Sequence, residues 1–206
     1  HYTIKMVYTM PTFHNPTSVT MSHSKREELI TICEKHKIII IEDSIEEEMK
    51  YFGKVHLPIK SIDAKGIVIY LGSFSKILAP GFRLGWIIAD SECIQRLTSL
   101  KTIFELSSNT LSQIILHNFC KNGYYELHIR KFQRAYKSRM RTALKALKNY
   151  IPAQKATWVE PLGGFLIWIK LNITNKDIDL ENHFRNFGVK VFVGRWCFIS
   201  SRRGGY

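Results

Sequence analysis

Residues Tyr70–Trp86 read YLGSFSKILAPGFRLGW, and this stretch carries the most specific chemistry in the chain. It starts as an apolar run and continues into a loop of small and hydroxyl-bearing residues that ends at Lys76. An amine placed there can form a Schiff base with an aldehyde. Ser73 and Ser75 supply hydroxyl donors, and Arg83 supplies a planar fork of N–H donors that matches phosphate oxygens. A bare serine–lysine turn is typical of a surface loop, but the added PGFRLGW segment favours a binding site.

Short apolar runs alternate with turns and one helical pattern in the first half of the chain. The run Ile38–Ile41 is continuous and β-branched, as expected of a strand buried on both faces of a parallel sheet. A helical pattern that opens after Ser22, a good N-cap residue, precedes this run. Strands, helix and loops in this order predict an α/β sheet. The predicted strands are Ile4–Met10, Ile38–Ile41, Ile67–Leu71 and Leu84–Ala89.

The carboxyl ends of these strands carry polar residues. Asp43 closes one predicted strand, and Ser73–Lys76 follows another. Ligands of open α/β sheets bind in the crevice beyond the carboxyl ends of the strands. The sequence therefore predicts that Asp43 and Lys76 lie on the same rim of the sheet.

The second half is predominantly helical and then mixed. Two helices are predicted between Ser91 and Cys120, with a break near Ser107–Asn109. The pattern of Tyr124–Tyr150 favours a core-packed helix with a basic, solvated outer face over a surface for a membrane or an acidic partner. Its expected apolar side is Leu127, Phe132, Tyr136, Met140, Leu144 and Leu147. The tail is predicted as a strand, a helix and a strand that form a smaller domain, over Phe165–Leu171, Asp177–Phe187 and Val189–Val193.

The composition is that of an ordinary globular protein, with 45% hydrophobic and 23% charged residues among 206. No run approaches the about 18 apolar residues of a membrane helix, and the first ten residues lack the apolar block of a signal peptide. Four cysteines without framework spacing suit reduced thiols in a cytoplasm. Cys33 and His36 have a metal-like spacing, but no second pair supports it, so a structural role is favoured.

The net charge of +13 allows two interpretations. A strongly basic chain can be attracted to nucleic acid or to acidic membranes. The lysines and arginines are spread over the whole length, however, without a basic block interleaved with aromatic residues. A lysine-rich, solvated surface is therefore the favoured interpretation, and a domain that itself binds nucleic acid is the weaker one.

Tyr70–Trp86 closely resembles the lysine motif of the class I/II aminotransferases of fold type I, which depend on pyridoxal phosphate. Two other motifs agree with that family in order and spacing. Pro11–Ser18, PTFHNPTS, is similar to its Asn-Pro-Thr-Gly turn, and Asp43 stands at the end of a strand as the family's aspartate does. The separation between Asp43 and Lys76 is also typical. Pro161–Phe165 resembles the start of its small-domain strand, so the resemblance covers essentially the whole chain.

The resemblance implies the fold type I architecture, in which a large α/β domain with a mostly parallel sheet precedes a smaller α/β domain. Residues 1–121 would be the C-terminal portion of the large domain, and residues 122–206 an incomplete small domain. A chain that begins at His1 and ends at Tyr206 after an RRGG turn looks truncated at both ends. The family's phosphate-binding glycine loop and cofactor-stacking aromatic residue are then expected before His1, and its substrate-carboxylate arginine beyond Tyr206. A homodimer is expected for the full-length protein.

The resemblance also implies the cofactor, pyridoxal 5'-phosphate, and the residues that contact it. Lys76 would hold the cofactor aldehyde and then shuttle the substrate proton as a general base. Asp43 would pair with the pyridine nitrogen and favour its charged form. Asn15 would donate a hydrogen bond to the ring hydroxyl. No metal is expected, and the remaining cofactor contacts would be Ser73, Ser75 and Arg83.

Three positions depart from the family's pattern. Ser18 replaces the turn glycine, so the loop must avoid a positive φ there or carry a small strain. Many relatives have a tyrosine soon after the aspartate that contacts the ring hydroxyl, but here Ser44–Glu46 comes next, and that contact is lost or supplied elsewhere. Val193 stands before Gly194 in place of the usual proline.

Two functions share this fold. One is an enzyme that moves an amino group between an amino acid and a 2-oxo acid. The other is the effector-sensing domain of a MocR-type regulator in the GntR family, which reaches DNA only through a separate winged-helix domain. The segments Glu42–Gly53 and Leu106–Met140 resemble the regulators more than the metabolic enzymes, and they favour the sensor. The ligand would be an amino acid or a 2-oxo acid in either case, and the location cytoplasmic.

Overall fold

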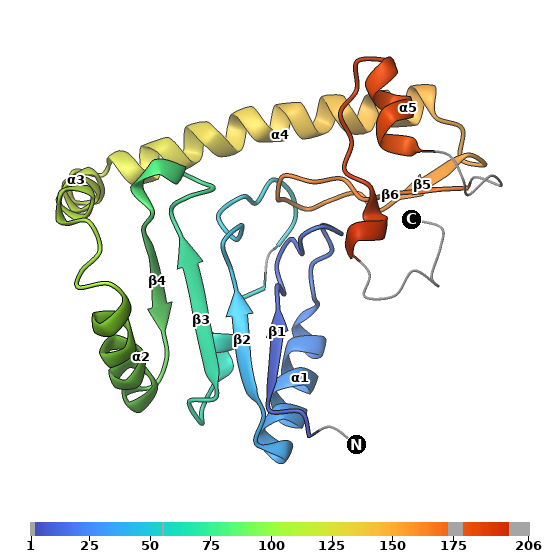
Figure 1. Cartoon of the computed structure of the whole chain (residues 1–206). Coiled ribbons are helices and arrows are strands. Elements are labelled where there is room, and N and C mark those ends of the chain that lie inside the picture. Colours follow the sequence, from blue (N-terminus) through green and yellow to red (C-terminus); the bar gives the residue numbers. More distant parts are fainter. Residues whose placement is uncertain (1–2, 55, 173–178, 198–206) are drawn as a thin grey trace.

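The computed structural model describes residues 3–54, 56–172 and 179–197, and its centre is a four-stranded sheet (Figure 1). The strands lie side by side in the order β1-β2-β3-β4. The first three are parallel, and β4 runs antiparallel to β3. This mostly parallel sheet confirms the predicted α/β class. The strands are β1 (Met6–Thr9), β2 (Ile39–Asp43), β3 (Val68–Ser73) and β4 (Gly85–Ile88).

Helix α1 (His23–His36) packs against the sheet through a small apolar core. Ser22 caps the helix as predicted, because its side chain accepts a hydrogen bond from the backbone N–H of Lys25 at 3.4 Å. Ile40 of β2 is fully buried, whereas Ile39 and Ile41, on the opposite face, are only partly buried, so the burial on both faces that the isoleucine run predicts is complete on one face alone. The core beneath α1 consists of Ile30, Cys33, Ile40, Ile59 and Val68.

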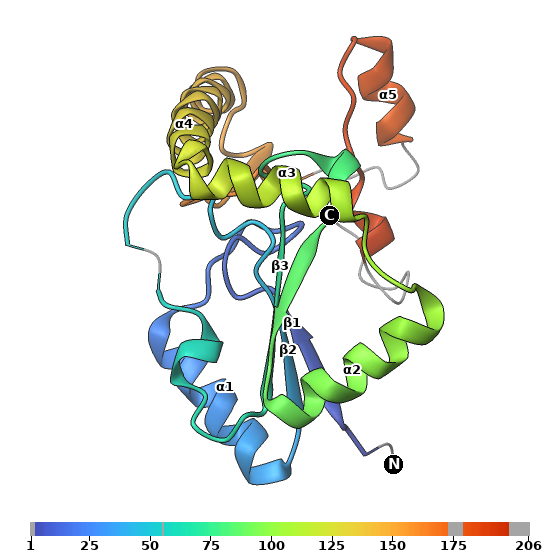
Figure 2. The same ribbon diagram turned by 90° about the vertical axis from the view of Figure 1, so that its left-hand side faces the viewer.

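Helices α1 and α2 lie on opposite faces of the sheet, and two further helices cross above its upper edge (Figure 2). The predicted break near Ser107–Asn109 separates α2 (Ser91–Phe104) from α3 (Thr110–Lys121). Asp90 caps α2 and Asn109 caps α3, each by accepting backbone N–H groups of the first helical turn. Three short 3₁₀ turns complete this set of helices: η1 (Ile59–Ile62), η2 (Pro80–Phe82) and η3 (Gly194–Cys197).

The long helix α4 (Tyr124–Tyr150) has the length that its amphipathic pattern predicts. Met140 and Leu144 are buried, and Phe132 and Tyr136 pack on the same core, as expected. Leu127, expected on the apolar side, is exposed. The buried residue near that end of the helix is Ile129 instead. The core that α4 shares with the first half of the chain consists of Met49, Tyr51, Ile77, Ile129, Met140 and Leu144.

The tail differs from its prediction. A two-stranded antiparallel sheet pairs β5 (Ala156–Trp158) with β6 (Ile169–Leu171), so the predicted strand over Phe165–Leu171 is much shorter, and its partner strand has no counterpart in the prediction. Helix α5 (Leu180–Asn186) lies within the predicted helix, whose first two residues fall outside the described part of the chain. The predicted strand over Val189–Val193 is wrong, because that segment has no strand pairing.

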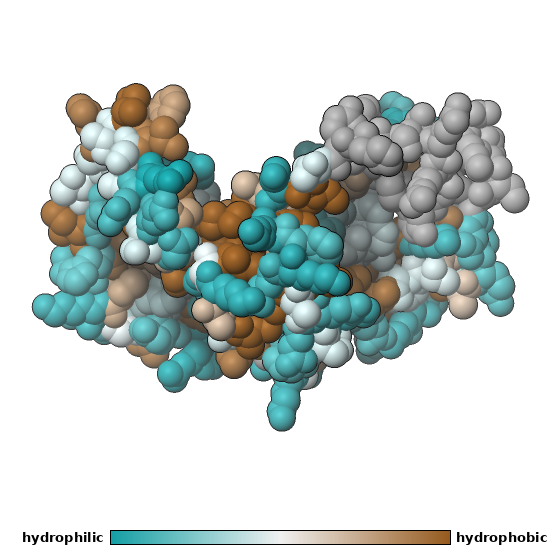
Figure 3. Space-filling model, turned by 90° about the horizontal axis from the view of Figure 1, so that it is seen from below, coloured by the Kyte–Doolittle hydropathy of each residue, from teal (hydrophilic) through white to brown (hydrophobic). Residues whose placement is uncertain are grey.

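Several large apolar side chains remain at the surface of the described residues. Seen from below, apolar surface gathers near the middle of the molecule and at one end (Figure 3). Contiguous exposed apolar surface is typical of contacts with further protein. No described helix is both long enough and apolar enough to pass through a membrane. The exposed side chains on the outer strands and on α2 and α3 include Met6, Tyr8, Ile87, Ile88, Leu100, Ile103, Phe104, Leu111 and Ile114.

One fully buried cation, Arg26 on α1, ties the loops to the sheet. Its guanidinium donates hydrogen bonds to the Pro11 carbonyl and the Thr12 hydroxyl at 2.9 Å each, and to the Leu57 carbonyl at 3.2 Å. The carboxylate of Glu42, also fully buried, lies 4.0 Å from it. Burial lowers the pKa of Arg26, and the negative charge of Glu42 opposes that shift. The pair therefore links the chain after β1 to the end of β2. Two buried charges of this kind are stable only while each is paired and hydrogen-bonded.

We predict that Arg26→Met destabilises the protein by about 3–5 kcal/mol, because it leaves the buried Glu42 carboxylate without its cation and several carbonyl groups without their donor. Chemical denaturation of the complete protein measures this loss. Arg96→Met is the matched control, because Arg96 forms an exposed ion pair with Glu92 on α2, and its loss costs at most about 1 kcal/mol. Equal unfolding midpoints for the two variants would contradict the prediction.

Candidate functional site

The predicted site residues come from one edge of the sheet. Asp43 is the last residue of β2, Ser73 is the last residue of β3, and Asn15 lies in the turn that comes after β1. The three strands are parallel and in register, with Asp43 opposite Leu71, so their carboxyl ends meet at the same edge. This confirms the prediction that Asp43 and the Ser73–Lys76 loop share one rim.

Asp43 is held in place by two hydrogen bonds. Its Oδ1 accepts the backbone N–H of Ile45 at 3.2 Å, and its Oδ2 accepts the hydroxyl of Tyr8 from the neighbouring strand. The side chain is buried to about nine-tenths. Burial, the hydrogen bond and the charge of Asp43 together raise the pKa of Tyr8 to about 12. Tyr8 is thus a neutral donor that orients the carboxylate at ordinary pH.

The loop after β3 presents Lys76 at the surface. Lys76 is exposed in a turn, and the next residue, Ile77, is buried in the core that includes α4. Ser73 Oγ accepts the N–H of Ser75 at 3.1 Å, which closes the start of the turn. Arg83 reaches back along the loop, and its Nη1 lies 3.4 Å from Ser75 Oγ. Ser73, Ser75, Lys76 and Arg83 therefore belong to one compact loop that is anchored by Ile77.

Close packing behind this loop demands glycine. A Cβ on Gly72 would lie 2.1 Å from the indole of Trp86, which is its partner across β3 and β4. A Cβ on Gly85 would lie 2.7 Å from the carbonyl oxygen of Gly72. The two glycines let β4 fold back tightly on β3, and this return brings Arg83 near Ser75.

The turn after β1 carries Asn15 and the substituted position Ser18. Asn15 is exposed. Ser18 has a φ of 58°, so the strain that its sequence predicts is present. Its side chain offsets part of that cost, because Ser18 Oγ donates a 2.6 Å hydrogen bond to the carbonyl of Leu166. A glycine could not make this bond, which ties the turn to the segment before β6.

Two further residues of this edge, Tyr8 and Glu46, are not evident as site residues from the sequence. Glu46 is 2% exposed, and its carboxylate interacts electrostatically with both Lys76 and Asp43. Burial raises the pKa of Glu46, although the charge of Lys76 and a backbone N–H from Phe165 oppose the shift. The alternation of side chains between the two faces of β1 is the sequence signal that could have indicated Tyr8 as a site residue. Glu46 looks like part of a solvated acidic run, Glu46–Glu48, and only the tertiary structure reveals its burial.

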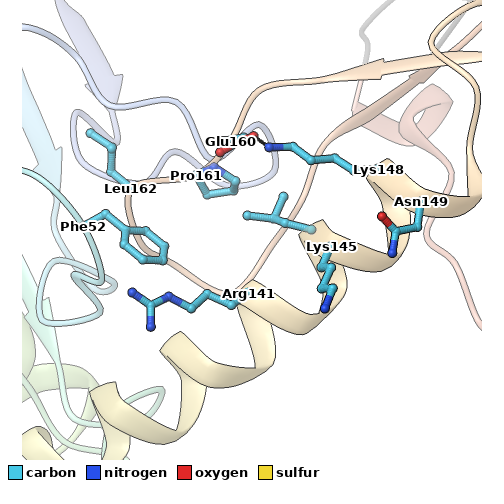
Figure 4. Close-up of a pocket in the computed structure, with 9 residues that line it drawn as sticks. Phe52, Arg141, Lys145, Lys148, Asn149, Glu160, Pro161 and Leu162 are labelled. Carbon is cyan, nitrogen blue, oxygen red and sulfur yellow. Dashed lines mark ion pairs between the residues drawn. The ribbon is translucent and has the colours of Figure 1, made fainter.

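One surface pocket lies away from this edge. It has a volume of about 420 Å³ and is bordered by the basic side of α4 and by Phe52, Pro161 and Leu162. Figure 4 shows Arg141 extended toward Phe52, and its guanidinium lies 5.4 Å from the ring centre. Lys148 and Glu160 form an ion pair at the other end. None of the predicted site residues lines it. A second cavity, of about 310 Å³, includes Ser73, Ser44 and Tyr70.

The side chains at the sheet edge fit a phosphate-bearing aldehyde with a basic ring nitrogen. The exposed amine of Lys76 can reach an aldehyde, and the loop offers a guanidinium and hydroxyl groups for a phosphate. At the other end, the oriented carboxylate of Asp43 suits a protonated nitrogen. Pyridoxal 5'-phosphate has these three groups.

Comparison with known proteins gives the same answer. The family described as Aminotransferase class I and II matches residues 3–195. The chain belongs to the class I and II aminotransferase family. The family's cofactor is pyridoxal 5'-phosphate, and its architecture is fold type I, which agrees with the mixed sheet and flanking helices found here.

Relatives of this family member include enzymes and regulators. The chain is 44% identical to aromatic-amino-acid aminotransferase 1 of Thermococcus litoralis over 168 residues, which are 82% of the chain and 40% of that enzyme. It is 40% identical to the uncharacterized HTH-type transcriptional regulator YdfD of Bacillus subtilis over 166 residues, which are 81% of the chain and 34% of that protein. The structure is similar to Pyrococcus horikoshii kynurenine aminotransferase, with a TM-score of 0.85 at 36% identity, over 90% of the chain and 46% of that enzyme. The chain thus spans less than half the length of these relatives.

We predict that Asp43→Asn lowers the pKa of Tyr8 from about 12 toward its ordinary value of 10.0, because the variant removes the negative charge that favours the neutral phenol. The fall should be partial, since burial is the largest cause of the shift and remains. Nuclear magnetic resonance of ring-labelled tyrosine, assigned with Tyr8→Phe, tracks the titration. Asp90→Asn, at the N-cap of α2, is the control and should leave Tyr8 unchanged. An unaltered Tyr8 titration in Asp43→Asn would disprove the coupling.

Proposed function

We propose that this chain binds pyridoxal 5'-phosphate through Lys76 as the effector-sensing part of a MocR-type regulator of the GntR family. The observation that carries the proposal is that Asp43 and Lys76 share one edge of the sheet. Asp43 is anchored at the end of β2, and the exposed Lys76 lies in the loop after the adjacent parallel strand β3. Similarity to HTH-type regulators, which extend well beyond the matched region, supports the sensor. DNA would be bound only by a separate domain of such a protein.

Each residue has a distinct part in this proposal. Lys76 holds the cofactor aldehyde and, once a ligand amine takes its place, accepts or returns a proton at Nζ. Asp43 keeps the ring nitrogen protonated, and Tyr8 keeps Asp43 oriented. Asn15 donates to the ring hydroxyl. The bound cofactor itself supplies an electron sink for charge at the α-carbon of the ligand. The phosphate is bound by Ser73, Ser75 and Arg83.

A metabolic aminotransferase is the second candidate. The 44% identity to an aromatic-amino-acid aminotransferase favours it, because the same residues would serve both functions. In that case the chain transfers an amino group between an amino acid and a 2-oxo acid. The two candidates differ in the consequence of ligand binding: a change in DNA affinity for the sensor, and turnover for the enzyme.

The proposal extends to the assembly and location of the full-length protein. An amino acid or a 2-oxo acid is the ligand, and a homodimer is the assembly, for which the exposed apolar side chains offer contact surface. Residues 1–121 form the C-terminal portion of the large domain, and residues 122–206 part of the small one. Four free cysteines suit a cytoplasmic location.

We predict that borohydride treatment of the complete protein with pyridoxal 5'-phosphate links the cofactor to Lys76, because the amine and aldehyde form a reducible bond. Peptide mass spectrometry identifies the modified residue. Lys76→Ala should lose this modification, whereas Lys50→Ala, a change at another exposed lysine, should retain it. A stoichiometric cofactor adduct that persists in Lys76→Ala would refute the assignment.

The sensor and the enzyme are separated by two measurements on the same preparation. The sensor predicts that an amino acid changes the affinity of the cofactor-loaded protein for its own promoter DNA, with slow or no turnover. The enzyme predicts steady-state production of a 2-oxo acid and no DNA binding. Sustained turnover without DNA binding would replace the sensor with the metabolic enzyme.

A further inference from the structure

The turn that carries Lys76 is supported by a helix from the second half of the chain. The turn, residues 74–79, closes on itself through the carbonyl of Phe74, which accepts the backbone N–H groups of Leu78 at 2.9 Å and Ala79 at 3.2 Å. Lys76 is exposed within it. These hydrogen bonds give the turn its shape, and its contacts with the rest of the molecule decide where Lys76 is held.

Helix α4 contacts this turn on both sides of Lys76. The ring of Phe74, two residues before the lysine, meets the ring of Tyr125 edge to face, with ring centres 5.8 Å apart. The side chain of Ile77, the residue after the lysine, is 1% exposed and shares a core with Ile129. Tyr125 and Ile129 are four positions apart, so they lie on the same side of the helix. The helix therefore supports the turn both before and after the residue proposed to hold the cofactor.

A polar contact between the helix and the turn comes from His128. Its Nε2 lies 2.7 Å from the backbone carbonyl oxygen of Ile77. A carbonyl oxygen only accepts hydrogen bonds, so Nε2 carries the hydrogen. In the part of the chain that the structure describes, no backbone N–H donates to this oxygen. The imidazole therefore supplies the partner that the carbonyl of a buried residue needs.

The imidazole of His128 is itself held by aromatic neighbours on two helices. It is partly buried and stacks on Phe132, one turn further along α4, with ring centres 5.3 Å apart. The ring of Phe119 on α3 contacts it edge to face, with ring centres 6.5 Å apart. Aromatic contacts of this kind have preferred geometries, so two of them restrict the rotation of the imidazole. His128 therefore presents its Nε2 hydrogen to the turn in a defined direction.

The same helix is also joined to the loop after Asp43. The Nε2 of Gln133 donates a hydrogen bond to the backbone carbonyl of Glu48 at 2.6 Å. One helix therefore supports both loops of the sheet edge, and His128 makes its hydrogen bond to the loop of Lys76.

We propose that His128 is a positioning residue for Lys76, because its hydrogen bond to the Ile77 carbonyl sets the orientation of the turn from which the amine meets the cofactor aldehyde. The proposal rests on the proposed function, in which Lys76 holds the cofactor. His128 acts through the backbone of the turn and needs no contact with the amine or the cofactor. Without its donor the turn takes several orientations, and only some of them bring the amine to the aldehyde.

The first test compares a pair of replacements of similar size in the complete, cofactor-free protein. His128→Gln keeps an N–H donor at a similar reach, whereas His128→Met fills similar space without a donor. Hydrogen–deuterium exchange follows the backbone N–H groups of Leu78 and Ala79, which are protected while the turn is closed. We expect their exchange to be about threefold to tenfold faster in His128→Met, because the loss of one hydrogen bond shifts a local opening equilibrium by about that factor. His128→Gln should stay close to the unaltered protein.

The second test measures how fast Lys76 becomes linked to pyridoxal 5'-phosphate in the same variants. Borohydride stops the reaction at intervals after the cofactor is added, and peptide mass spectrometry quantifies the linked lysine. We expect linkage to be about threefold to tenfold slower in His128→Met, because the amine is less often placed at the aldehyde, and His128→Gln to recover most of the rate. His117→Met, a change at an exposed histidine of α3, is the control and should alter neither exchange nor linkage.

Three results would overturn the proposal. Unchanged exchange in His128→Met would mean that the bond does not hold the turn. Equal effects in His128→Met and His128→Gln would mean that the donor is not what matters. Faster exchange with linkage at the unaltered rate would remove the positioning role. If His128→Met does not fold, His128→Asn replaces it, because its amide is too short to reach the carbonyl and it should behave as a variant without the donor.

The same preparations distinguish failure of this inference from failure of the proposed function. If borohydride links the cofactor to Lys76 in the unaltered protein but neither measurement depends on His128, only the positioning role is lost. If the cofactor does not link to Lys76 in the unaltered protein at all, the proposed function fails, whatever the exchange rates are.

Discussion

The arrangement of the sheet edge depends on the burial of one cation, Arg26. Its guanidinium joins backbone segments that have no regular secondary structure, namely the chain leaving β1, the approach to α1 and the loop before η1. Buried carbonyl groups need partners, and here one side chain from a helix provides them. Glu42 closes the arrangement, because its two carboxylate oxygens accept the backbone N–H groups of Ile59 and Lys60 at 2.8 Å each. Since Glu42 immediately precedes Asp43, the fixed charge pair also fixes the residue expected to meet the cofactor ring.

Parallel pairing then turns this local constraint into a site. The side chains beyond β1, β2 and β3 are far apart in sequence, but the register brings all three carboxyl ends to one edge. The antiparallel strand β4 adds what a fully parallel sheet could not, because its tight return over Gly72 and Gly85 sends the chain back past the Lys76 loop. Arg83 thereby reaches Ser75, eight residues earlier. The eight-residue spacing of Ser75 and Arg83 is therefore compatible with a tight return between two paired strands.

The elements that could be predicted are those whose signal is local. The isoleucine run, the Ser22 cap and the break before α3 depend on nearby residues, and each appears where the sequence places it. The failures concern residues whose environment is set by distant segments. Val189–Val193 is apolar enough for a strand but has no strand pairing, and Leu127 remains exposed on a helix whose apolar side is otherwise well predicted. Glu46 belongs to a run of three glutamates that looks solvated, and its burial depends on Phe165, more than a hundred residues away. A motif can name Lys76 and Asp43 from sequence, but it cannot reveal which other charges surround them.

The distribution of charge at this edge has a consequence for orientation. The chain as a whole is strongly basic, with a net charge of +13, yet the end of β2 carries the buried carboxylates Asp43 and Glu46, beside a third, Glu42, that is paired with Arg26. The guanidinium of Arg83 and the serine hydroxyls lie on the loop after β3. Consider a ligand with a phosphate at one end and a protonatable nitrogen at the other. The carboxylates repel its phosphate and attract its protonated nitrogen. The polarity of the edge therefore favours one orientation of such a ligand before any covalent bond forms.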